Sequence, residues 1–227
     1  VVAVDYRLAP EHTHPAALDD AEAAFDAMSA EYETVIVGGD SAGGQLAAAL
    51  CLRLRDRAAA RSRDTAPAMA QPAAQLLIYP ALGATPKGGS YASNAHAPGL
   101  TTADVSYYWT HYAGHSAWAT SDDETLTPLR AENLRDLPPA IIISAGLDPL
   151  RDDATLFATR LTEAGVAVAW RNDPQLVHGH LRARHMSNTA MECFLWICRA
   201  LADVVNQPML LRIDEIDELD DDDIAEI

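Results

Sequence analysis

Hydrophobic residues along the chain fall into two alternating patterns. Short continuous apolar runs predict buried strands at residues 35–37, 74–79, 140–145 and 166–170. Between these runs, apolar residues recur every three or four positions, which predicts helices at residues 15–28, 45–50, 154–164 and 190–204. Strands that alternate with helices are typical of an α/β fold with a mostly parallel, doubly wound sheet. The first helix is predicted to begin at Pro15 and to pack its apolar face on this sheet.

The junction between the first apolar run and the helix after it carries the pattern Gly39-Asp40-Ser41-Ala42-Gly43. A serine on a sharp strand-to-helix turn needs small residues two positions before and after it, because two backbones pass closely there. The turn predicts a nucleophilic Ser41 at the N-terminus of a helix, where the Ala42 N–H can donate to a developing oxyanion. A glycine-rich turn without chemistry is the alternative interpretation.

Two further residues occupy the positions that a serine nucleophile requires. Asp148 follows the apolar run at residues 140–145, and His178 lies in the loop after the run at residues 166–170. His178 would remove the Ser41 proton, while Asp148 would hold the imidazole in the required tautomer. Alternatively, Asp148 only begins a turn, or a neighbouring histidine, His180 or His185, replaces His178.

A long segment at about residues 83–137 separates the second and third predicted strands. Its centre, residues 102–112, has a helical pattern and is rich in aromatic residues, so we expect a helix there. Tyr108 and Trp109 of this helix, together with Asp40 and Leu150, are predicted to line the substrate pocket. The rings could equally fill only the core of this segment. The spacing of the three histidines in this segment, at positions 96, 111 and 115, matches no metal site.

Composition limits the functions that the chain can have. It has 227 residues, 49% of them hydrophobic, and a formal net charge of −17 at pH 7, which argues against nucleic-acid binding. No apolar run reaches the 18 or so residues that span a bilayer. Three cysteines without metal-type spacing predict buried thiols in a cytoplasmic protein, and no cofactor is expected.

Acidic residues are concentrated at the end of the chain. The segment 209–227 holds nine acids against Arg212 alone. We therefore divide the chain into a catalytic domain at residues 1–206 and an acidic, disordered tail at residues 207–227. Whether the chain forms a homo-oligomer stays open.

Three motifs together resemble one family. They are VDYRLAPE at residues 4–11, GGDSAGG at residues 38–44 and DPLRDD at residues 148–153. In this order they are similar to the hormone-sensitive-lipase-like carboxylesterases of the α/β-hydrolase fold, with matching stretches from residue 1 to about residue 205. The resemblance implies hydrolysis of carboxylic esters with short to medium acyl chains through an acyl-enzyme on Ser41, with Asp148 and His178 completing the triad. It also implies that the segment at about residues 83–137 forms a helical cap over Ser41.

The chain departs from the family pattern in two places. The family's His-Gly-Gly-Gly oxyanion loop precedes the Tyr-Arg-Leu-Ala-Pro stretch, whereas only five residues precede Tyr6 here. We therefore expect an N-terminally truncated fragment with weak or no activity, and a gap or rearranged pairing beside a strand at residues 1–4. In addition, His180 stands where the family usually has Phe. A catalytically impaired fragment, a receptor-like relative that binds a small ligand, and an amide hydrolase with the same triad are the alternatives.

Overall fold

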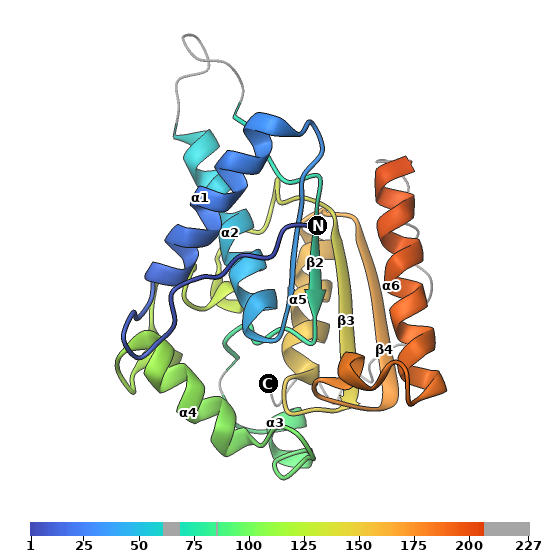
Figure 1. The fold of residues 1–227 in the computed structure, drawn as a ribbon. Coiled ribbons are helices and arrows are strands. Elements are labelled where there is room, and N and C mark those ends of the chain that lie inside the picture. Colours follow the sequence, from blue (N-terminus) through green and yellow to red (C-terminus); the bar gives the residue numbers. More distant parts are fainter. Residues whose placement is uncertain (61–68, 85, 207–227) are drawn as a thin grey trace.

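The computed structural model describes residues 1–60, 69–84 and 86–206. Four parallel strands form one sheet in the order β1-β2-β3-β4, and Figure 1 shows the chain crossing between them through helices. The strands are β1 (Ile36–Asp40), β2 (Ala74–Ile78), β3 (Ala140–Leu147) and β4 (Val168–Val177). The predicted α/β class and the four predicted strands are confirmed. The acidic tail predicted at residues 207–227 lies outside the described residues.

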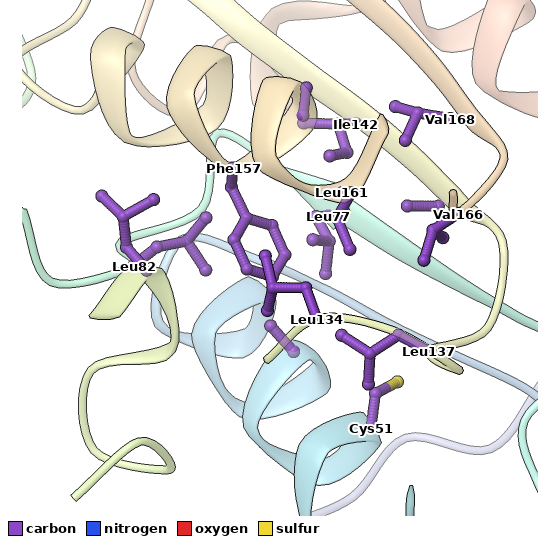
Figure 2. Packing of buried hydrophobic residues seen from close by; sticks show 14 of the residues in the cluster. Cys51, Leu77, Leu82, Leu134, Leu137, Ile142, Phe157, Leu161, Val166 and Val168 are labelled. Atoms are coloured by element: carbon purple, nitrogen blue, oxygen red, sulfur yellow. The ribbon is translucent and has the colours of Figure 1, made fainter. Parts of the chain in front are cut away.

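Helices cover both faces of the sheet. On one face, α2 (Ala42–Ala59) and α5 (Arg151–Glu163) bury a cluster centred on Phe157, which is 0% exposed. Figure 2 shows Phe157 projecting from α5 among Leu77 of β2, Leu82 and Leu134. On the other face lies α6 (Asn188–Asn206), which packs against β2 and β3 and appears on the opposite side of the sheet from α2 in Figure 1. Alternation along β2 explains the two layers, because Leu77 enters the first cluster and Ile78 the second.

Helix α1 (Ala16–Glu31) does not pack where the sequence predicted. Its buried face, including Leu18 and Phe25, packs mainly on α2 rather than directly on the sheet. Polar contacts hold the same two helices together: Arg57 Nη2 lies 2.6 Å from Asp26 Oδ1, and Arg53 Nη1 lies 2.6 Å from Asp19 Oδ1. The prediction was wrong because an amphipathic stripe shows that a face is buried but not which element buries it.

Residues 1–4 form no strand in the described structure. Val1, Val2 and Val4 are exposed, and this segment extends along the surface before Arg7 forms ion pairs with Asp20 of α1. The strand expected there is therefore wrong. Its apolar sequence is suited to a strand, but a strand also needs a neighbour to pair with its backbone.

Among the described residues between β2 and β3, four helical elements are found. They are α3 (Gly89–Ser93), α4 (Thr102–Ala113), η1 (Trp118–Thr120) and η2 (Pro128–Arg130). The helix predicted at residues 102–112 is confirmed as α4. It begins with a capping box between Thr101 and Asp104 and ends at Gly114, whose φ of 77° suits glycine. The segment has its own hydrophobic cluster, which we call the cap cluster, in which Trp109 stacks on Trp118 with ring centres 5.0 Å apart.

A last short helix, η3 (His180–Ala183), follows β4.

In the described ranges, no helix combines the length and the apolar composition needed to cross a membrane.

Candidate active site

Ser41 occupies a strained turn between β1 and α2. Its φ of 56° and ψ of −115° lie where residues with a side chain are rarely found. The Ser41 N–H donates to the Ile78 carbonyl at 2.9 Å, which ties the turn to the end of β2. Because α2 begins at the next residue, the side chain lies at the positive end of the helix dipole.

The two glycines of the motif are not equivalent. A Cβ on Gly39 would lie 2.4 Å from the carbonyl carbon of Gly43, so position 39 must be glycine. A Cβ on Gly43 would meet no atom within 4 Å in the described structure. The expectation that both positions require a small residue is therefore confirmed for Gly39 and wrong for Gly43, because only the Cβ direction at Gly39 faces the opposing backbone.

Ser41, His178 and Asp148 form a continuous hydrogen-bonded chain. His178 Nε2 lies 2.9 Å from Ser41 Oγ, and His178 Nδ1 lies 2.6 Å from Asp148 Oδ2. Since a carboxylate can only accept, Nδ1 carries the proton and Nε2 accepts from the serine hydroxyl. The structure thus brings together all three side chains that the sequence predicted, although they lie far apart along the chain.

The surroundings of Asp148 fix its orientation. The side chain is 0% exposed, and its second oxygen, Oδ1, accepts the Leu150 N–H at 2.8 Å. Asn94 Nδ2 donates to the backbone carbonyls of Gly146 and Asp148, at 3.1 Å each, and so holds the turn after β3. These contacts fix the Asp148 carboxylate in the direction of the imidazole. Asp148 therefore does more than begin a turn, which was the alternative interpretation of its sequence context.

The neighbouring His180 serves a different purpose from His178. Its Nδ1 lies 3.1 Å from the Val177 carbonyl and its Nε2 lies 3.3 Å from Cys193 Sγ. Burial lowers the pKa of His180, which favours the neutral imidazole. Of the two, His178 is the histidine that contacts Ser41.

Tyr79 is a site residue that the sequence did not reveal. Its ring lies 4.8 Å from the His178 ring and 5.1 Å from the His180 ring, measured between centroids. Its hydroxyl donates to Asp40 Oδ2 at 3.4 Å, and burial raises its pKa. With a φ of 35° at the end of β2, it is one of the few non-glycine residues in the left-handed region. A tyrosine that directly follows an apolar strand does not indicate, from sequence alone, that its ring will contact two histidine rings.

A cavity of about 380 Å³ opens beside Ser41. Its lining comes from residues 6–9, from α1, α2 and α4, and from loop residues such as Leu150, which directly precedes α5. It includes the predicted pocket residues Tyr108, Trp109 and Leu150. Trp109, only 4% exposed, lines the cavity and also belongs to the cap cluster. The same ring therefore lines the pocket and fills the core of the cap, so the two interpretations of the aromatic residues do not exclude each other. The lining is largely apolar.

Some pocket assignments differ from those predicted. Asp40 does not line the cavity, because its carboxylate accepts the Tyr79 hydroxyl. Tyr6, Leu8 and Tyr112, which were not predicted, do line it. Tyr6 and Leu8 belong to the extended N-terminal segment, whose path could not be inferred from hydrophobic periodicity.

Comparison with known proteins identifies the class. Residues 1–182 match the family model described as the alpha/beta hydrolase fold, and the chain belongs to this family. The resemblance to hormone-sensitive-lipase-like carboxylesterases is confirmed.

Individual relatives point in the same direction. The chain is 41% identical over 189 residues to the carboxylic ester hydrolase LipN of Mycobacterium tuberculosis, with 80% of this chain and 48% of LipN aligned. It is 41% identical over 190 residues to the esterase LipI of the same organism, covering 80% of this chain and 55% of LipI. An esterase structure from Pyrobaculum calidifontis aligns with a TM-score of 0.77 at 30% identity, over 88% of this chain and 64% of that one. The chain spans about half the length of the curated relatives it matches.

Proposed function

We propose that the chain carries the catalytic centre of a serine carboxylesterase. The observation that supports this most directly is the chain of hydrogen bonds from Ser41 through His178 to Asp148, at 2.9 and 2.6 Å, beside an apolar cavity. This arrangement is the one required for nucleophilic attack by a serine with a histidine base.

The proposed reaction has two halves. Ser41 Oγ attacks the ester carbonyl carbon while His178 Nε2 takes its proton, and the resulting oxyanion accepts a hydrogen bond from the Ala42 N–H at the N-terminus of α2. Collapse of the intermediate breaks the bond to the alcohol, which leaves with the proton returned by His178. Water then attacks the acyl-enzyme by the same route and releases the acid. Asp148 keeps the imidazole oriented and stabilises its cationic form.

The cavity supports a small ester as the substrate. Its volume of about 380 Å³ lies at the lower end of the roughly 300–1,000 Å³ typical of small-molecule sites. Walls formed by Leu100, Val105, Trp109 and Leu150 favour an apolar acyl or alcohol group. We therefore propose short to medium acyl chains. We also propose a cytoplasmic location, which the free thiols of the cysteines support.

A fluorophosphonate probe tests the proposal without depending on efficient turnover. We expect covalent labelling at Ser41, identified by peptide mass spectrometry, and no labelling of Ser41→Ala. Aryl butyrate should be hydrolysed faster than aryl dodecanoate, and each ester faster than the matching amide. A folded chain that binds small apolar ligands in the cavity but neither reacts with the probe nor hydrolyses any ester would instead be a catalytically impaired fragment or a receptor-like relative, and the esterase proposal for this chain would be wrong.

A further inference from the structure

Three side chains with metal-binding atoms meet beneath α6, next to the Ser41 centre but without sharing a residue with it. Asp173 comes from β4, His180 from η3 and Cys193 from α6, and their ligand atoms all lie within 4.8 Å of one another. The residues are 4%, 3% and 0% exposed. We propose that this Asp–His–Cys cluster is a binding site for a thiophilic divalent cation, with Zn²⁺ as the best match.

The tautomer of His180 favours this assignment. Because Nδ1 lies 3.1 Å from the Val177 carbonyl, it carries the proton, and the lone pair of Nε2 is directed at Cys193 Sγ. A metal-binding histidine characteristically has this arrangement, in which one ring nitrogen donates to a carbonyl and the other faces the ion.

Asp173 is also held in the manner of a ligand. Arg171 Nε donates to both carboxylate oxygens at 3.0 Å, and Arg171 Nη2 donates to Oδ1 at 2.6 Å. Outer contacts of this kind fix the orientation of a carboxylate toward an ion. The guanidinium also neutralises the buried carboxylate before any ion is bound, which explains how the cluster can exist without one.

The donor set selects among metals. One thiol sulfur, one imidazole nitrogen and one carboxylate oxygen are typical zinc ligands, whereas Ca²⁺ and Mg²⁺ prefer oxygen alone. Zinc bonds of about 2.0–2.3 Å place tetrahedral ligand atoms roughly 3.3–3.6 Å apart. The distance of 3.3 Å between His180 Nε2 and Cys193 Sγ already fits this requirement. The cluster supplies three ligands, and a water molecule would complete the tetrahedron.

Binding would proceed as an exchange of a proton for a metal ion. The S–H bond of Cys193 breaks, a metal–thiolate bond forms, and the proton passes to solvent. No oxidation takes place. The ion would join β4, η3 and α6 and so fix the loop that carries His178, yet it would share no ligand with the Ser41 centre.

Titration of the full chain with Cd²⁺ tests the site, because a cadmium–thiolate bond produces an ultraviolet charge-transfer band. We expect the band to saturate at one Cd²⁺ per chain and to fall when Zn²⁺ is added in competition. It should be lost in Cys193→Ser. His180→Phe keeps the thiol, and we expect it to weaken binding by more than about tenfold, since even outer partners of a metal site contribute that much.

Two control variants separate this site from other thiols and from the Ser41 centre. Cys198→Ser removes an exposed cysteine of the same helix and should leave the band unchanged. Ser41→Ala should also leave it unchanged. Absence of the band in folded wild-type protein, its persistence in Cys193→Ser or at full strength in His180→Phe, or its loss in Cys198→Ser would each overturn the proposal. Circular dichroism checks folding, and if Cys193→Ser does not fold, His180→Phe decides the outcome.

Discussion

Replacing Asp148 with asparagine is expected to reverse the imidazole tautomer on which the proposed chemistry depends. In the structure, Asp148 Oδ1 accepts the Leu150 N–H at 2.8 Å, and Oδ2 accepts from His178 Nδ1 at 2.6 Å. An asparagine at this buried position keeps its carbonyl oxygen toward the Leu150 N–H, because its NH₂ group cannot accept that bond. The NH₂ group then faces His178 Nδ1 and forces the ring proton onto Nε2. A protonated Nε2 cannot take the proton of Ser41, which lies only 2.9 Å away.

The expected loss is large. In triads of this kind, the wrong tautomer lowers kcat by on the order of 10⁴-fold, which corresponds to about 5 kcal/mol in the activation barrier. Stability should change much less, since asparagine has nearly the same shape as aspartate and keeps the bond to Leu150. The second-order rate of fluorophosphonate labelling measures the loss for Ser41, and kcat for an aryl butyrate gives an independent value.

Controls make this result specific. Asp122→Asn makes the same chemical change at an exposed acid and should label at the wild-type rate. Thermal melts establish that both variants are folded. If folded Asp148→Asn labels within about tenfold of wild type while Ser41→Ala does not label at all, the carboxylate does not set the tautomer, and the reasoning from the Leu150 contact is refuted.

Three further changes test other parts of the structure. Gly39→Ala should lower the free energy of unfolding, measured by urea denaturation, by roughly 1–3 kcal/mol or more, because the added Cβ overlaps the backbone of Gly43. Gly43→Ala should stay within about 1 kcal/mol of wild type. Equal effects of the two variants would contradict this geometry. Phe157→Ala should cost about 3–5 kcal/mol in the same assay, and a loss below 1 kcal/mol would show that the cluster around it is loosely packed. Burial raises the pKa of Asp153 to about 7, compared with 3.8 in an unfolded chain. Hydrogen bonds from three backbone N–H groups and a tyrosine hydroxyl act in the opposite direction and lower this pKa, but by less than burial raises it. The folded state therefore holds a proton that the unfolded state releases, so the contribution of this group is fully present below pH 3.8 and is lost as the pH rises through about 7. Between pH 5 and 6.5, the unfolding free energy of wild type should thus fall relative to Asp153→Asn by up to about 1.4 kcal/mol per pH unit, and parallel curves would show that the hydrogen bonds dominate instead.

The order of the strands and helices and the three residues of the triad could be predicted from the sequence, because burial and catalytic chemistry restrict which residue types can stand at those positions. The order of strands and helices followed from apolar runs and stripes. Ser41, Asp148 and His178 could be found because each lies in the segment that follows a predicted strand, and the carboxyl ends of parallel strands lie at the same edge of a sheet. Helix α4 was predicted from the helical pattern of an aromatic-rich stretch, and it is bounded by Thr101 and Gly114.

Features that depend on tertiary contact could not be predicted in this way. Strand β4 continues through a polar stretch to Val177, because β3 pairs with it as far as Leu147, although residues 171–177 lack an apolar pattern. The contact between Tyr79 and His178 and the placement of Asp40 away from the cavity follow from side-chain directions at strand ends. The Asp173–His180–Cys193 cluster joins three elements, so no spacing along the chain reveals it.

The distance along the chain between the residues of the hydrogen-bonded triad affects when the serine becomes reactive. Ser41 and His178 are separated by 137 positions, so a ribosome has completed β1, β2 and β3 before it adds the imidazole. Until then, the hydroxyl is that of an ordinary alcohol, with no base beside it. On the proposed function, the growing polypeptide therefore carries no reactive serine until β4 and the residue after it have been made, and sensitivity to acylating compounds should arise only when β4 has paired with β3.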